Sequence, residues 1–167
     1  MSLSIKIDVQ GALLKGKAPE IVQKNLEEAV TKVTELLHAE VVKRTPQGVS
    51  PAGSGLLHTI NSKVIQKGTP IVKGIVFHGS KYGDVIEKGR AAGKGIPIDE
   101  LTTWVQRRLG ITDPEMVRKV SIIISTRAKK YGIKGVHMFE NALNENMDKI
   151  EVIINKAGFD IVKELSE

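Results

Sequence analysis

Apolar residues recur at helical spacing over a long segment in the first third of the chain. The apolar positions of this segment are Leu26, Val30, Val33, Leu37 and Val41. They lie on one side of a helix with 3.6 residues per turn, so the spacing predicts a helix from Pro19 to about Arg44. Pro19 suits a first helical turn. Pro46 predicts the end of the helix, because a proline disfavours helical geometry in the residue before it.

Alternation of apolar and polar residues predicts three strands. Residues 4–9 alternate with the period of two that a half-buried strand shows. Residues 60–67 and 71–78 predict a hairpin whose connection is Gly-Thr-Pro at 68–70. The segment 47–55 is rich in Gly, Ser and Pro and predicts a flexible loop.

Two shorter segments follow the predicted hairpin. Residues 82–88 fit a short strand or a helical turn equally well. Residues 89–95 contain three glycines together with Arg90 and Lys94, and predict a second mobile loop.

Helical patterns return in the C-terminal half. The stripe Leu101, Trp104, Val105 and Leu109 predicts a helix from about residue 98 to 109 that ends at Gly110. Thr112 or Asp113 then caps a second helix that has Pro114 in its first position and ends near Gly132. Its predicted buried positions are Val117, Val120, Ile123, Ile124 and Ala128. Residues 138–165 predict one or two further helices, with a break at Gly158.

These elements define an α+β fold class. We expect one domain over residues 1–167, in which a small antiparallel β-sheet is packed by the long N-terminal helix. The helix pair at 97–131 is expected to be an insertion in this domain, and the chain ends in C-terminal helices. A chain of 167 residues is long enough to bury a core of its own.

Composition excludes several classes of protein. Hydrophobic residues make up 41% and charged residues 26% of the chain, which is ordinary for a globular protein. Cysteine is absent, so disulfides and thiolate metal sites are excluded. No apolar run has the length of a membrane span, and the N-terminus has no apolar core of a signal peptide. We therefore expect a soluble, non-secreted protein with no membrane partner.

The net charge of +6 raises the question of nucleic acid. Basic residues occur throughout the chain, and their clusters at 107–108, 118–119 and 127–130 are short. A dispersed excess favours solubility over a binding footprint. Aromatic residues make up only 4%, which argues against a platform for base stacking.

No constellation of residues predicts catalysis, a metal or a cofactor. The histidines, His38, His58, His78 and His137, have no second ligand at metal-binding spacing. No serine stands in a Gly-x-Ser-x-Gly turn. The Gly-Ser-Gly at 53–55 and the Gly-Lys-Gly at 93–95 lack the full phosphate-loop spacing. We expect a protein that is not an enzyme and holds no cofactor.

The helix pair at 98–130 is similar in order to a helix-turn-helix, and a DNA-binding regulator is therefore the alternative function. Such a motif reads bases from the N-terminal end of its second helix, where polar and basic residues are needed. Here that end carries Asp113 and Glu115, which repel phosphate. The pair is better explained as a packing unit.

The order of motifs resembles the neck or tail-component family of tailed bacteriophages, which acts in head–tail joining and tail completion. The long helix ends in a basic-Thr-Pro step at 43–46, and a Gly-x-Leu loop with its strand follows at 54–60. A Tyr-centred segment reaches Glu-x-Gly at 81–89. Longer members insert a helix pair like that at 97–127, and all end in an aromatic step like that at 135–143. The loop after the long helix departs from the family in its length and lacks the family's aspartate, and His-Met-Phe replaces Pro-Phe at 137–139.

The resemblance implies a non-enzymatic virion protein, made in the bacterial cytoplasm and placed in the neck or tail. It implies a homo-oligomeric ring, with six subunits to match a tail tube. Its other partners would be a head connector or stopper protein and a tail terminator or tail-tube protein, with non-specific contact to DNA passing through the lumen. Arg90 and Lys94 would meet an acidic neighbour or DNA, unless they are merely solvated. The residues expected to make contacts are Gly55, Leu56, Tyr82, Glu87, Arg90, Lys94, Trp104, Arg107, Arg108 and Phe139.

Overall fold

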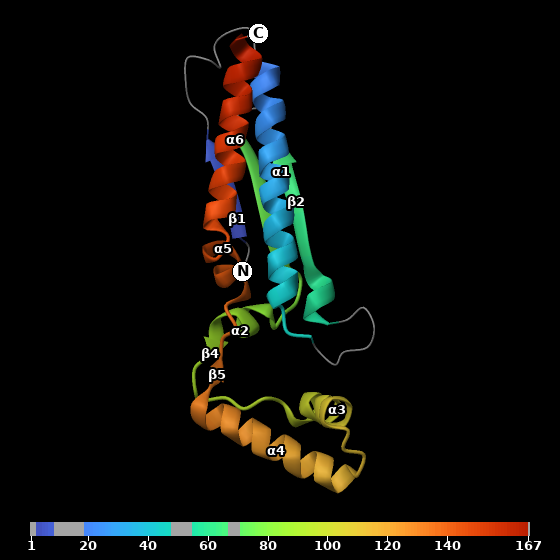
Figure 1. Ribbon diagram of the computed structural model, residues 1–167. Coiled ribbons are helices and arrows are strands. Elements are labelled where there is room, and N and C mark those ends of the chain that lie inside the picture. Colours follow the sequence, from blue (N-terminus) through green and yellow to red (C-terminus); the bar gives the residue numbers. More distant parts are fainter. Residues whose placement is uncertain (1–2, 9–18, 48–54, 67–70, 167) are drawn as a thin grey trace. The chain divides into compact units, whose positions relative to one another are not determined.

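The computed structural model describes residues 3–8, 19–47, 55–66 and 71–166 and has the expected α+β fold (Figure 1). Contacts between residues divide the chain into two compact units. The first unit comprises Met1–Thr45, Ile60–Gly79 and Met138–Glu167, and the second comprises Pro46–Thr59 and Ser80–His137. The predicted insertion at 97–131 lies inside the second unit, which is larger than the insertion.

The first unit contains an antiparallel three-stranded sheet in the order β1-β3-β2. Its strands are β1 (Leu3–Asp8), β2 (Ile60–Gln66) and β3 (Ile71–His78). The predicted strands and the pairing of the hairpin are confirmed. The connection at 68–70 and most of the loop at 47–55 lie outside the described residues.

Helix α1 (Pro19–Arg44) packs on this sheet, and both of its predicted ends are confirmed. All five of its predicted apolar positions are buried. Gly74 of β3 makes the close approach of α1 possible. A Cβ atom built there would lie 1.9 Å from Oγ1 of Thr34 and 3.1 Å from Cγ1 of Val30. A side chain at position 74 would therefore collide with the helix.

Helices α5 (Met138–Asn144) and α6 (Met147–Ser166) complete the first unit. Figure 1 shows α6 running beside α1, in agreement with the contacts between them. The predicted break at Gly158 is wrong. Gly158 lies within α6, and the helices separate at Glu145 and Asn146 instead. The buried Asn146 side chain donates to the carbonyl of Ala142 at 2.9 Å, and its backbone carbonyl accepts from Ile150 at 3.0 Å, so one residue joins both helices.

The first described elements of the second unit are a short 3-10 helix at Leu56–Thr59 and helix α2 (Gly83–Lys88). Of the two structures that the sequence allowed at residues 82–88, a short strand or a helical turn, the structure has the helical one. Strand β4 (Gly89–Arg90) follows and pairs antiparallel with β5 (Ile133–Lys134). The backbone N–H groups of Val136 and His137 donate to the carbonyls of Ile86 and Glu87 at 2.8 and 3.0 Å, which caps the end of α2.

Helices α3 (Ile98–Leu109) and α4 (Pro114–Tyr131) pack on each other and begin and end as predicted. Gly110 has the left-handed conformation that ends α3, with φ +66°. Asp113 is the cap of α4, because its carboxylate accepts from the backbone N–H of Met116 at 2.8 Å.

The predicted burial on these two helices is only partly correct. Leu101 and Val105 of α3 and Val117 and Ala128 of α4 are buried. Three predicted core residues are exposed instead, namely Trp104, Leu109 and Ile123. The buried residues of each helix fall on one side, and residues away from that side keep a large exposed fraction. Among the helices that the structure describes, none is long and apolar enough to cross a membrane.

Candidate interaction surfaces

The charge of the chain is divided unevenly between the two units. The second unit contains twelve Lys and Arg residues against six Asp and Glu residues, so it carries the whole net charge of +6. The first unit contains thirteen of each and is neutral. The sequence interpretation of a dispersed basic excess is therefore wrong. The localised charge could have been found in the sequence from the spacing of the acidic residues, because no Asp or Glu occurs between Glu115 and Glu140.

Helix α4 carries most of this positive charge on its exposed sides. Arg118 and Lys129 are eleven residues apart, which is three helical turns, so they lie on the same side of the helix. Both side chains are exposed, as are those of Arg127 and Lys130. Lys119 is different, because its Nζ atom is 2.8 Å from a carboxylate oxygen of Glu115. The N-terminal turn of α4 is thus locally neutralised, and its C-terminal half is not.

The segment after β4 is held against the C-terminal half of α4. The N–H of Gly93 donates to the carbonyl of Lys129 at 2.9 Å, and Oγ of Ser125 donates to the carbonyl of Ile96 at 2.7 Å. Nη2 of Arg90 donates to the carbonyls of Lys94 and Gly95 at 2.6 and 3.2 Å. The first two residues of the predicted loop at 89–95 thus form β4, and the rest of the segment is hydrogen-bonded to α4 and to Arg90. These contacts bring the exposed Lys94 to the cations of α4.

We call Lys94, Arg118, Arg127, Lys129 and Lys130 the basic surface. All five are exposed and all belong to the second unit. Exposed apolar side chains are interspersed with them on α4, including Ile122, Ile123 and Tyr131. Nζ of Lys130 lies 5.0 Å from the ring centre of Tyr131, over its face.

A second candidate surface lies on α6 in the first unit. One side of this helix packs toward α1 through Ile150, Ala157 and Ile161. Val152, Phe159 and Val162 are 66%, 74% and 63% exposed, respectively. Their spacing of seven and three residues places them together on the side of α6 that faces away from its packed positions. We call these three residues the α6 stripe.

Four of the residues predicted to make contacts are buried. Gly55 and Leu56 lie at the start of the short 3-10 helix, where the Gly55 carbonyl accepts from His58. Glu87 of α2 is 1% exposed, and Phe139 of α5 is 1% exposed with its ring 5.9 Å from that of His78. These side chains are not part of the exposed surface.

The other predicted contact residues are distributed over the second unit. Tyr82 precedes α2 and is exposed, and Trp104, Arg107 and Arg108 are exposed on α3. Arg90 is half-buried, and two of its donor contacts are the carbonyls described above. Only Lys94 belongs to the basic surface. The α4 members of the basic surface and the α6 stripe were not predicted as site residues.

The end of α1 carries a network of charged side chains. The guanidinium of Arg44 donates to the carboxylates of Glu40 and Glu145, which connects α1 to the junction of α5 and α6. The hydrogen bond from Arg44 lowers the pKa of Glu40 below its ordinary value of 4.5, and the positive charge of Lys43 acts in the same direction. Hydrogen bonds to Glu40 and Glu145 raise the pKa of Arg44.

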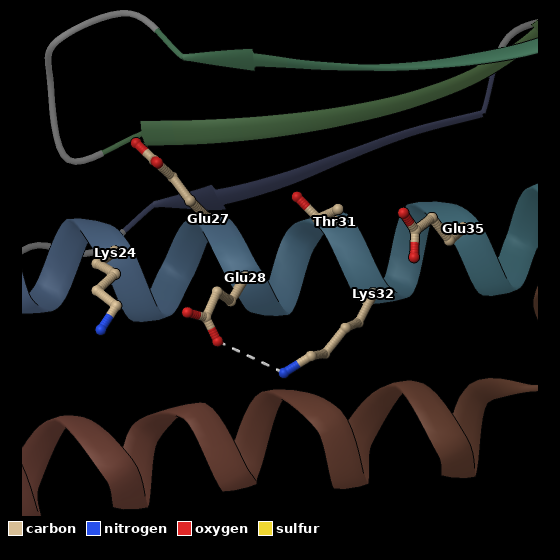
Figure 2. Close-up of a pocket in the computed structure, with 6 residues that line it drawn as sticks. All are labelled: Lys24, Glu27, Glu28, Thr31, Lys32 and Glu35. Atoms are coloured by element: carbon tan, nitrogen blue, oxygen red, sulfur yellow. Dashed lines mark ion pairs between the residues drawn. The ribbon is translucent and has the colours of Figure 1, made fainter.

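A shallow hollow runs along the solvent side of α1 (Figure 2). It is lined by Lys24, Glu27, Glu28, Thr31, Lys32 and Glu35. Its charged residues form an exposed pair between Glu28 and Lys32, at 3.6 Å, of the kind found four residues apart on surface helices. Within the described residues, no group of three or more His, Asp or Glu side chains is arranged to hold a metal ion.

Comparisons with family models, curated proteins and solved structures give no match to this chain.

Proposed function

We propose that the protein is a structural, non-enzymatic subunit of the neck of a tailed phage, which assembles into a ring at the connection between head and tail. The order of motifs along the chain suggests this function. The observation that carries it is the α6 stripe, because three large apolar side chains on one side of a helix are covered by no described part of the chain. Grouped apolar side chains on a surface mark sites of protein association.

A ring requires a particular kind of contact. Each subunit must present two different surfaces, so that the contact repeats head to tail and closes by rotation. The α6 stripe supplies one apolar surface. The exposed apolar residues of α3 and α4, among them Trp104 and Ile123, supply another of different composition. The neighbours in the particle would be a head connector or stopper and a tail terminator or tail-tube protein.

The test is the mass of the purified protein as a function of concentration, measured by light scattering and by electron microscopy. We expect discrete oligomers, with six subunits for a ring that matches a tail tube. Phe159→Asp should shift the distribution toward the monomer. Ser62→Asp is the control, because it adds the same charge at an exposed position of β2, outside the α6 stripe and outside helices α3 and α4. A protein that stays monomeric at all concentrations and never joins purified heads or tails would refute the proposal.

A further inference from the structure

We propose that the basic surface binds the sugar–phosphate backbone of double-stranded DNA without reading its sequence. This inference assigns a surface to the non-specific DNA contact that the resemblance implies, and it does not depend on ring formation, because it concerns an activity of the isolated chain. It begins from the position of the charge. An excess of six positive charges in the second unit alone, beside a neutral first unit, is a localised field that attracts a polyanion.

The cations of the basic surface are available for phosphate contacts. The five side chains are exposed, and Lys94 is brought to α4 by backbone hydrogen bonds of its own loop. Arg118 and Lys129 lie along one side of α4, about 16 Å apart at 1.5 Å per residue. That distance spans several phosphates of one DNA strand, which follow each other at about 3.4 Å along the helix axis. Lys130 points about 100° and Arg127 about 160° away from Lys129 around α4, so Arg127 lies nearly opposite, and on α4 the contacts to one DNA strand come from Arg118, Lys129 and Lys130.

The same helix is poorly suited to reading bases. Base readout by a helix pair uses the N-terminal end of the second helix. In α4 this end holds Asp113, whose carboxylate caps the helix, and Glu115, which pairs with Lys119. The positive charge lies further along the helix and on the adjoining loop. Contacts of that kind fix position and affinity and carry no sequence information.

The arrangement of apolar residues favours DNA over an anionic membrane. A helix that lies in a membrane interface collects its apolar residues on one face. The apolar side of α4 is already buried through Val117 and Ala128. Met116 and Ile123 are exposed and seven residues apart, so they share a side of α4, but the exposed Arg127 follows Ile123 by four residues and lies on that same side. Ile122 points about 100° away from Ile123, given 3.6 residues per turn. The exposed apolar residues of α4 therefore form no face that is free of charge.

The experiment measures binding to fluorescent duplexes by anisotropy over a range of salt concentrations. Two 30-base-pair duplexes of unrelated sequence should bind equally well. The logarithm of affinity should fall with the logarithm of salt concentration with a slope of about −0.9 for each phosphate contacted. The double variant Lys129→Gln/Lys130→Gln should reduce the size of this slope by about one to two and weaken binding roughly tenfold or more near 0.1 M salt. Far-UV circular dichroism checks that it is folded.

The matched control is Lys24→Gln/Lys32→Gln on α1. It removes the same charge from exposed helical positions of the neutral unit, and its slope should equal that of the unchanged protein. Equal losses in both double variants would show that net charge alone acts, and would overturn the proposal. So would the absence of binding at low salt, a strong preference for one duplex, or binding to phosphatidylserine vesicles without binding to DNA. None of these results depends on whether rings form, so failure here is distinct from failure of the neck proposal.

Discussion

Gly110 and Gly132 of the second unit both have positive φ angles but very different surroundings, and substituting each by alanine separates two causes of destabilisation. Gly110, at the end of α3, has φ +66° and ψ +18°, and a Cβ atom there would have no neighbour within 4 Å. Gly132, at the end of α4, has φ +77° and ψ −165°, a region that essentially only glycine occupies. A Cβ atom at Gly132 would lie 2.3 Å from the carbonyl oxygen of Arg90 and 3.0 Å from the backbone carbon of Ala91 and from the backbone nitrogen of Ala92.

The expected free energies of unfolding follow from these surroundings. In Gly110→Ala the alanine adopts the left-handed conformation without a steric clash, and this conformation costs about 1–2 kcal/mol. In Gly132→Ala the alanine adopts a less favourable backbone conformation, which costs about 1–3 kcal/mol. It must also push β4 away from β5, and overpacking of this kind costs a further ~1–3 kcal/mol. The atoms in the way are backbone atoms, so no side chain can rotate aside. From the middle of these ranges we expect Gly132→Ala to lose about 2–3 kcal/mol more stability than Gly110→Ala.

Urea unfolding measures this difference well, because the spectroscopic probes all lie in the second unit. Trp104 is the only tryptophan, and Tyr82 and Tyr131 are the only tyrosines. Hydrogen exchange gives a local check. The N–H groups of Gly93, Val136 and His137, all bonded between segments of this unit, should exchange faster in Gly132→Ala and not in Gly110→Ala. Equal losses of stability in the two variants, with unchanged exchange at these amides, would refute the reasoning.

Two further predictions concern the first unit, and their urea unfolding is followed by far-UV circular dichroism, because the tryptophan and both tyrosines lie in the second unit. Gly74→Ala should destabilise the protein by about 1–3 kcal/mol through its collision with Thr34, and urea unfolding of the double variant with Thr34→Ala should show a smaller loss than the sum of the single ones; strictly additive losses would contradict the contact. Because Arg44 holds the folded-state pKa of Glu40 below its unfolded value, the ionised carboxylate stabilises the fold above about pH 4.5, and this contribution is lost as the pH falls through the lower folded-state pKa. The stability difference between the unchanged protein and Glu40→Gln, from urea midpoints, should therefore be present at pH 7 and shrink below pH 4.5, and a difference that is constant over this range would contradict the assignment.

The sequence predicted those elements whose local signals agree with each other. In α1, apolar spacing, a proline at the start and a Thr-Pro step at the end all indicate the same bounds, and both are confirmed. The cap of α4 was likewise predicted from neighbouring residues alone. The burial of Trp104 and Ile123 could not be predicted from neighbouring residues in the sequence. Helical spacing defines the apolar side of a helix but not how much of that side a neighbouring helix covers. Those residues were predicted to be buried and are exposed.

Glycine was the least reliable signal, for a physical reason. A glycine permits flexibility, but it also permits backbone segments to approach where no Cβ atom fits. Gly89 and Gly132 serve the second purpose, since a Cβ atom at either would lie within 2.4 Å of a carbonyl oxygen of the facing strand or its extension. Gly158 serves neither, because it lies inside α6 with open space around it. Sequence alone does not distinguish these three environments.

The division of charge connects the two proposals. Copies of the first unit can approach each other without net repulsion, because that unit is neutral, and the α6 stripe belongs to it. Every copy added to an assembly also brings a second unit of charge +6, and like charges that are brought close together repel. Salt or a bound polyanion lowers that repulsion. Association through an apolar stripe and binding of DNA through a basic surface are therefore compatible in one chain, and DNA that neutralises the second units would favour the assembled state over the free subunit.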